Sequence, residues 1–246
     1  MKVNVLSGNM LKVIAAVCMA IDHIGMLFFP KITLLRIIGR LSFPIFAYMI
    51  AEGCRYTKNK LKYFGLIFFP AAICQGAYYL VDNKGKYMCV LITFSLSILM
   101  IYALQYLKKV VFAHEKSVLK ILLGGALFAL LVWGTWKANT LLQIDYGFWG
   151  SMLAVFISIF QPAGREDKSI LNKTDHIFVH AVMMTLGLWL LSFSKGVMKV
   201  QIYSLLSVIV MLLYSGEKGK WNMKYFFYVF YPVHLALLGG IYLLIR

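Results

Sequence analysis

The sequence predicts an all-α membrane protein, a polytopic helical bundle of about nine transmembrane helices. Hydrophobic residues make up 61% of the chain and charged residues only 14%, whereas soluble domains average about 25% charged residues. Several mostly apolar stretches of about 20 residues, the length that crosses a bilayer as a helix, follow one another. Because a backbone in lipid must satisfy its own hydrogen bonds, these stretches are expected to be helices. We expect residues 1–246 to form one helical domain.

The predicted helices lie in nine apolar segments. The three shortest are 144–161, 176–192 and 199–214, and one of them could be re-entrant or tilted. The nine segments are 10–29, 33–53, 61–81, 88–107, 118–136, 144–161, 176–192, 199–214 and 225–245.

The charge distribution predicts how the chain crosses the membrane. There are 25 basic and 9 acidic residues, a balance that in a soluble protein would suggest a nucleic-acid partner. Here the basic residues gather in short loops after the even-numbered segments, for example at Lys58, Lys109, Lys173 and Lys218. The positive-inside rule places these loops and the N-terminus in the cytoplasm, and nine spans place the C-terminus outside. We expect a multi-pass protein of the cell membrane with no nucleic-acid partner.

The four cysteines and the sequence "DHIFVH" do not predict a metal site. Cys18, Cys54, Cys74 and Cys89 are scattered in or near apolar segments without a CxxC pair, which favours small buried side chains. His176 and His180 are spaced as some zinc ligands are, but the segment lacks the glutamate of an HExxH motif. We therefore expect no metal.

The first segment, 10–29, contains adjacent ionisable residues, Asp22 and His23. Such residues are expensive inside a bilayer and commonly functional. Lys12 lies eleven residues before His23 and shares its helix face, separated by a rise of about 16 Å. Asp22 points about 100° away from His23, so Asp22 is expected to meet a cation on another helix.

The second segment, 33–53, supplies those cations. Arg36 and Arg40 are four residues apart and share one face of the helix. Gly39 lets another helix approach closely, and Pro44 is expected to kink the helix. Glu52 lies at the predicted cytoplasmic end of the same segment.

Two later segments contribute further candidates. "QIDYGFWG" places Asp145 at the start of the sixth segment, and "YVFYPVHLALL" places Tyr231 and His234 on one face of the ninth. Each candidate also has a structural interpretation. Asp22 could only neutralise an arginine, Lys12 could only anchor its helix at the lipid headgroups, and Tyr231 could serve packing. Glu52 could form an interfacial ion pair with a nearby basic residue.

Four blocks of the sequence resemble the TraX family of integral membrane proteins, whose namesake is associated with N-acetylation of conjugative pilin. They are "LKVIAAVCMAIDHIGMLFFP", "LRIIGRLSFPIFAYMIAEGCRYTKN", "DYGFWG" and "KYFFYVFYPVHLALL". The family is similar to transmembrane acyltransferases of the acyltransferase-3 type, which have an arginine, ten residues and then a histidine in the first helix. Lys12 stands at the arginine position and His23 at the histidine position, and lysine lacks the bidentate fork of arginine.

The resemblance implies acetyl transfer from cytosolic acetyl-CoA, as co-substrate, to an amine or hydroxyl of a peptide, glycan or lipid. His23 would be the general base, since its ordinary pKa suits proton transfer near neutrality. Asp22 or Asp145 would orient the imidazole or an arginine. Lys12, Arg36 and Arg40 would stabilise an oxyanion or the CoA phosphates.

Two other classes of function stay open at this stage. A proton-coupled transporter or flippase would use Pro44, Pro70 and Pro232 in broken helices and the buried charges as a proton relay. A non-enzymatic membrane partner of a secretion or pilus system would have no need of so costly a polar cluster. The sequence identifies neither the acceptor nor the oligomeric state.

Overall fold

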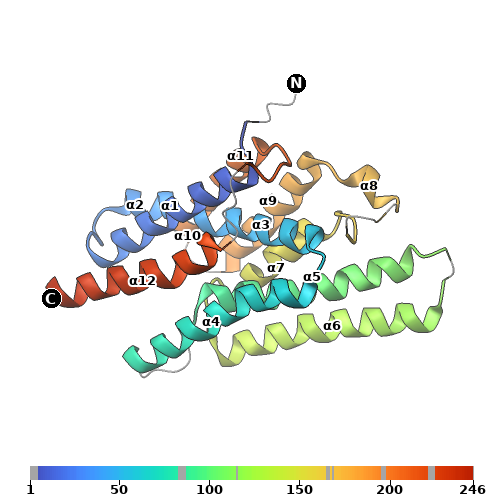
Figure 1. Ribbon diagram of the computed structural model, residues 1–246, viewed down its shortest axis with the longest axis horizontal. Coiled ribbons are helices and arrows are strands. Elements are labelled where there is room, and N and C mark those ends of the chain that lie inside the picture. The colour runs from blue at the N-terminus through green and yellow to red at the C-terminus, as the bar shows by residue number, and fades with distance from the viewer. Residues whose placement is uncertain are drawn as a thin grey trace. The chain divides into compact units, whose positions relative to one another are not determined.

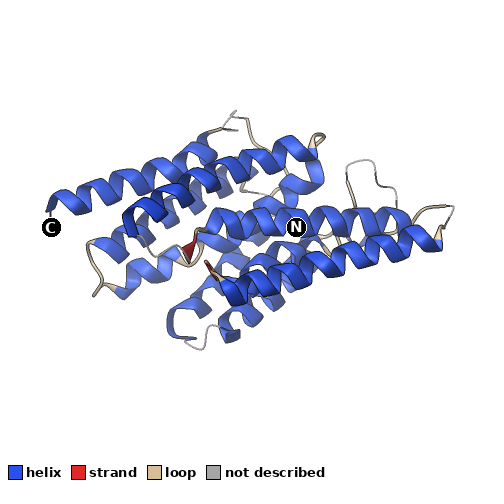
Figure 2. Ribbon diagram, turned by 90° about the horizontal axis from the view of Figure 1, so that it is seen from below, coloured by secondary structure: helices blue, strands red, loops and turns tan. Residues whose placement is uncertain are grey.

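The computed structural model is almost entirely helical, which confirms the predicted all-α class (Figures 1 and 2). The structure describes residues 5–82, 87–114, 116–164, 167, 169–194, 198–220 and 225–245. Within these ranges the sheet content is one parallel pair of two-residue strands, Tyr87–Met88 (β1) and Gln143–Ile144 (β2).

The helices follow the nine predicted apolar segments in order (Figure 1). The long helices are α1 (Gly8–Leu27), α3 (Ser42–Tyr56), α4 (Lys60–Asp82), α5 (Val90–Val111), α6 (Val118–Leu141), α7 (Gly147–Ser158), α9 (Ile177–Ser194) and α12 (Phe226–Ile245). The short ones are α2 (Thr33–Gly39), α8 (Leu171–Thr174), α10 (Met198–Gln201), the 3-10 helix η1 (Ile202–Leu205) and α11 (Leu206–Leu212).

The helices identify a membrane protein. In the described ranges, 6 stretches are long and apolar enough to span a bilayer: α1, α2 with α3, α5, α6, α9 and α12. The predicted count of nine is not confirmed. Helix α6 shows the pattern of a lipid-facing helix, because only Gly124 and Thr135 are buried along it. Its large apolar side chains, such as Leu130 and Trp133, are exposed, which suits lipid and not water.

The predicted helix 33–53 is interrupted. Helix α2 ends at Gly39 and α3 begins at Ser42. Pro44 accounts for the break, because it has no N–H to donate to the carbonyl of Arg40, four residues earlier. The predicted segment 199–214 is likewise divided, into α10, η1 and α11.

The chain divides into two compact units. The first contains Met1–Met49 and Leu188–Arg246, and the second contains Ile50–Gly187. The prediction that the whole chain is a single domain stays a prediction.

In the first unit, α1 packs against α2 and α12. A β-carbon at Gly25 of α1 would lie 2.7 Å from the β-carbon of Leu35, so this glycine permits the close approach of α2. The start of α1 is capped by the side chain of Ser7, which accepts a hydrogen bond from the amide of Met10 at 3.3 Å. The amide of Gly8 donates to the Glu217 carbonyl at 2.7 Å, which satisfies another unpaired N–H of the first turn.

Helices α1 and α12 run in the same direction (Figure 1). The ammonium of Lys12 lies 5.6 Å from the ring centroid of Phe227, near the start of both helices. The ring centroids of Phe28 and Tyr242 are 6.1 Å apart, near their ends. This parallel alignment sets the two predicted histidines, one on each helix, at similar heights.

In the second unit, α5 packs against α4, α6 and α7. Small polar side chains line its contact with α7, where the Ser97 hydroxyl donates to the Ser151 carbonyl at 2.7 Å. Such interhelical contacts are typical of membrane helices, whose apolar faces gain nothing from leaving lipid. The four cysteines are free thiols and buried, as predicted.

Candidate functional site

The first unit contains a cluster of one carboxylate and two guanidinium groups. Asp22 of α1 lies 2.9 Å from Nη1 of Arg36, which also donates to the Asp22 carbonyl at 3.1 Å. Nη2 of Arg40 donates to both carboxylate oxygens of Asp22, each at 2.9 Å. The predicted contact between Asp22 and cations of the second segment is confirmed.

Gly39 makes this cluster possible. It lies between the two arginines, and a β-carbon there would overlap the side chain of Asp22. The predicted close approach at Gly39 is confirmed, and what approaches is the Asp22 carboxylate itself. The glycine therefore sets the position of the charge as well as the spacing of the helices.

The two arginines differ in their remaining hydrogen-bonding capacity. Arg40 also donates from Nε to the Arg36 carbonyl and from Nη1 to the side-chain oxygen of Gln201, each at 3.4 Å. Arg36 contacts Asp22 through Nη1 alone, and its side chain is 28% exposed against 14% for that of Arg40. Arg40 thus makes more of the hydrogen bonds in the cluster, and Arg36 is the more exposed of the two arginines.

His23 lies beside His234 of α12, a pair that the sequence did not predict. Nδ1 of His23 is 3.1 Å from Nε2 of His234, and the ring centroids are 5.0 Å apart. His234 is buried, and its ring is stacked on Phe230 with centroids 4.7 Å apart. Tyr231, which is also buried, meets the same ring edge-on at 5.6 Å. These contacts fix the orientation of His234 and give Tyr231 a packing role.

The hydrogen bonds assign the tautomers of the neutral pair. Nδ1 of His234 lies 2.8 Å from the carbonyl oxygen of Phe230, which can only accept, so this nitrogen carries the hydrogen. Nε2 of His234 is then an acceptor, and Nδ1 of His23 is the donor to it. The lone pair of His23 is therefore on Nε2, which is the tautomer that a general base requires.

Lys12 lies apart from this cluster. Helix geometry puts it about 16 Å along α1 from His23, so the two cannot bind one small group. Its ammonium lies over the ring of Phe227, and it forms no ion pair with an acidic residue of the described ranges. Lys12 is thus an unneutralised cation near the start of α1.

Asp145 and Glu52 belong to the second unit. The carboxylate of Asp145 accepts a hydrogen bond from the amide of Tyr146 at 3.0 Å, and its carbonyl accepts one from the Thr93 hydroxyl at 2.7 Å. These bonds position the start of α7, where Tyr146 has a left-handed backbone with φ 59°. A role for Asp145 in orienting the imidazole or an arginine, and a functional role for Glu52, stay predictions.

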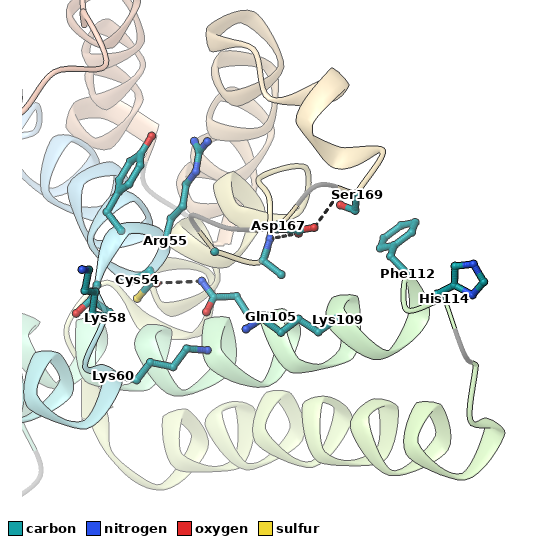
Figure 3. A pocket seen from close by; sticks show the side chains of 14 residues that line it. Cys54, Arg55, Lys58, Lys60, Gln105, Lys109, Phe112, His114, Asp167 and Ser169 are labelled. Carbon is teal, nitrogen blue, oxygen red and sulfur yellow. Dashed lines mark hydrogen bonds between the residues drawn. The ribbon is translucent and has the colours of Figure 1, made fainter.

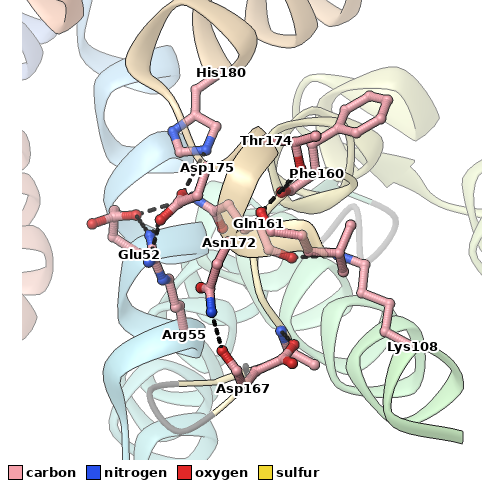
Figure 4. Close-up of polar contacts among 12 residues, drawn as sticks. Glu52, Arg55, Lys108, Phe160, Gln161, Asp167, Asn172, Thr174, Asp175 and His180 are labelled. Atoms are coloured by element: carbon pink, nitrogen blue, oxygen red, sulfur yellow. Dashed lines mark hydrogen bonds and ion pairs between the residues drawn. The ribbon is translucent and has the colours of Figure 1, made fainter. Parts of the chain in front are cut away.

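Glu52 joins a second polar cluster, which Figure 4 shows. The carboxylate of Glu52 is buried, accepts a hydrogen bond from Gln161 at 3.0 Å and lies 3.8 Å from Arg55. Arg55 donates through both terminal nitrogens to Asp175, and His180 lies 3.2 Å from the same carboxylate. The predicted pair of Glu52 with a basic residue is thus part of a larger network.

The network lowers the pKa of Asp175. Burial alone would raise this pKa, but the hydrogen bond with His180 and the charge of Arg55 outweigh it. One signal of this arrangement is visible in the sequence, namely the short spacing of Asp175 and His180 in "DHIFVH". No group of three or more His, Cys, Asp or Glu side chains in the described ranges is placed to hold a metal ion.

Comparison with known proteins identifies the family. The family described as TraX protein matches residues 7–242, which include every candidate residue named above. The chain belongs to the TraX family. This TraX-family protein is 28% identical over 249 aligned positions to the probable fimbrial assembly protein FimC, serogroup H1, of Dichelobacter nodosus. The alignment covers 94% of each chain.

A shorter match is to an uncharacterised protein of Rickettsia prowazekii (strain Madrid E). It is 39% identical over 54 residues, covering 22% of this TraX-family chain and 21% of the relative. No solved structure matches.

Proposed function

We propose that this TraX-family protein is a membrane acetyltransferase of the cell membrane. It would move the acetyl group of acetyl-CoA to an amine or hydroxyl of a peptide, glycan or lipid. The observation that carries the proposal is the His23–His234 hydrogen bond, which leaves the lone pair of His23 on Nε2. A base of this kind within an apolar helix has little value to a purely structural protein, because its desolvation is costly.

In the proposed reaction, Nε2 of His23 takes the proton of the acceptor as the acceptor nitrogen or oxygen attacks the acetyl carbonyl. The new bond forms as the carbon–sulfur bond breaks, and the proton passes to the departing CoA thiolate. The products are the acetylated acceptor and CoA. Arg36, the more exposed of the two arginines, would stabilise the negative charge that develops on the carbonyl oxygen.

The relatives favour a peptide among the three acceptor classes. The Dichelobacter nodosus relative carries the name of a fimbrial assembly protein, and fimbriae are built from peptide subunits. The resemblance to the pilin-acetylating namesake points the same way. We therefore propose the N-terminal amine of a fimbrial or pilin-type subunit as the first acceptor to test.

The test is acetyl-CoA hydrolysis and transfer by the purified protein in detergent, with wild type beside His23→Ala. We expect wild type to release CoA. The rate should be at least about 100-fold lower in the variant, which is the usual contribution of a general base. His176→Ala is the matched control, since this exposed histidine lies at the start of α9. Unchanged activity in a folded His23→Ala protein would overturn the assignment.

The transporter alternative predicted from the prolines has weaker support. That alternative rests on three prolines in broken helices. Pro70 and Pro232 lie inside continuous helices, and Pro44 alone of the three adjoins a break. Accumulation of a substrate in proteoliposomes without acetyl-CoA, together with no CoA release, would favour transport instead.

A further inference from the structure

The second unit contains a basic pocket of about 970 Å³ (Figure 3). Three connections line it: the turn between α3 and α4, the end of α5 and its following loop, and the loop after α7. Among the described residues, its basic side chains are Arg55, Lys58, Lys60 and Lys109, and its carboxylate is Asp167. This volume is at the upper end of small-molecule sites and exceeds what a single inorganic phosphate fills.

Three of the four cations have no acidic partner in the part of the chain that the structure describes. Arg55 is neutralised by Asp175, but no ion pair within the described ranges involves Lys58, Lys60 or Lys109. Lys60 and Lys109 are close enough to repel each other, and Figure 3 shows their side chains converging below Gln105. Lys60 also lies 4.8 Å over the ring of Tyr102, which does not neutralise its charge. Like charges held close together favour the binding of an anion.

The carboxylate of Asp167 does not act as the counterion of these lysines. Oδ2 of Asp167 accepts the amide hydrogen of Ala163 at 2.6 Å, and Oδ1 accepts that of Ser169 at 2.8 Å. Burial would raise the pKa of Asp167, but these backbone hydrogen bonds lower it. Asp167 thus shapes the loop after α7, and its charge is satisfied by the backbone.

The pocket also offers aromatic rings. Tyr56 and Phe112 line it and are 40% and 46% exposed. The guanidinium of Arg55 lies 4.8 Å over the Tyr56 ring, so Phe112 is the ring better placed to stack on a ligand. In Figure 3, Phe112 and His114 lie well separated from Lys58 and Lys60. An anion with phosphates at one end and a flat base at the other would satisfy both groups, because bases stack on aromatic side chains.

We propose that this pocket binds a multiply phosphorylated nucleotide, the adenosine bisphosphate portion of coenzyme A. The identification of coenzyme A rests on the proposed acetyl transfer, whereas the anion site rests on the lysines and the rings alone. The three lining connections are those that the positive-inside rule places in the cytoplasm, where acyl-CoA is available.

The experiment measures equilibrium binding of adenosine 3′,5′-bisphosphate and of coenzyme A to the full-length protein in phosphatidylcholine nanodiscs. Adenosine, which lacks the phosphates, is the ligand control. We expect the Lys60→Ala/Lys109→Ala protein to bind both phosphorylated ligands at least about tenfold more weakly. Lys137→Ala removes an exposed lysine of α6 outside the pocket and is expected to leave binding unchanged.

Two further measurements keep the result interpretable. Wild-type affinity should fall as salt rises, because the attraction is between charges. Phe112→Leu should weaken the nucleotide more than inorganic pyrophosphate, because only the nucleotide has a base to stack. Wild type that does not bind the bisphosphate, or lysine variants that bind it normally, would overturn the proposal. So would a lysine effect confined to the binding of phosphatidylglycerol, measured in a second set of nanodiscs that contain this lipid, which would assign the pocket to a lipid headgroup.

The outcomes separate this proposal from the acetyltransferase proposal. Lysine-dependent nucleotide binding without any His23-dependent transfer would support the pocket and reject acetyl transfer. His23-dependent transfer with an unchanged KM for acetyl-CoA in the lysine variants would reject the pocket and keep the enzyme.

Discussion

Nδ1 of His23 lies 3.1 Å from Nε2 of His234, and the carbonyl of Phe230 holds the other nitrogen of His234 at 2.8 Å. This chain of hydrogen bonds ends at a backbone carbonyl, which stabilises positive charge that develops on the histidines during proton transfer. In the proposed reaction, His234 would therefore position His23 and would not itself be the base.

His234→Ala is expected to slow acetyl transfer by about 10- to 100-fold, less than the loss of His23, because the base would remain but without its orientation. His234→Gln should recover part of the rate, since the amide oxygen can accept the hydrogen of Nδ1. The measurement is kcat/KM for acetyl-CoA against pH, and the profile should shift in His234→Ala. Val233→Ala, an exposed neighbour on α12, is the control. A profile identical to that of wild type would show that His234 only packs.

Arg40→Ala is expected to destabilise the protein more than Arg36→Ala. Arg40 binds both oxygens of Asp22 and also Gln201, while Arg36 approaches one oxygen. Removing one partner of a buried ion pair costs about 3–5 kcal/mol. The two arginines are partly exposed and share one carboxylate, so the loss of unfolding free energy in each variant should lie near or below that range. Thermal unfolding in detergent measures the order, and the reverse order would contradict it. The rate of acetyl transfer should show the opposite order, with Arg36→Ala slower than Arg40→Ala, because Arg36 is the arginine proposed to stabilise the oxyanion.

Gly39→Ala is expected to lower both thermal stability and activity. The new β-carbon would overlap the side chain of Asp22 and force the carboxylate away from the arginines. Gly125→Ala is the matched control, because a β-carbon there meets nothing within 4 Å and alanine favours a helix by up to about 1 kcal/mol. We expect the control to be neutral or more stable than wild type. Equal melting temperatures for the two variants would exclude a steric role for Gly39.

Asp175→Asn is expected to lower stability at neutral pH and to matter less in acid. The folded-state pKa of Asp175 lies below its ordinary value, since His180 and Arg55 more than offset the effect of burial. The charge of Asp175 thus contributes its full stability above the unfolded-state pKa, about 3.9, and the contribution is lost as the pH falls through the lower folded-state pKa. Melting temperatures of wild type and variant from about pH 7 to about pH 3 should therefore converge at the acidic end. A difference in melting temperature that stays constant with pH would show that the charge of Asp175 contributes nothing to stability.

The sequence predicted the parts of the first cluster that follow from solvation and local geometry. A carboxylate in an apolar helix needs a cation, so the sequence predicts that Asp22 meets a cation of another helix. Pro44 predicts a kink in the second segment, and the structure has a break between Gly39 and Ser42. The His23–His234 pair was not foreseen, because the residues are 211 positions apart and meet only when α1 and α12 pack in parallel. The basic pocket was missed for a similar reason, since its lysines come from different connections that the sequence could treat only as topology signals.

The parallel alignment of α1 and α12 predicts opposite locations for the chain ends. Six spans in sequence would make the first and last antiparallel, whereas these two helices run in the same direction. We therefore predict that an odd number of the remaining helices, such as α4 or α7, also cross. A green fluorescent protein fused to the C-terminus should be dark, and an alkaline phosphatase fused there should be active. An antibody should reach an N-terminal tag only after the membrane is permeabilised. A fluorescent C-terminal fusion in intact bacteria would contradict an odd number of spans with a cytoplasmic N-terminus.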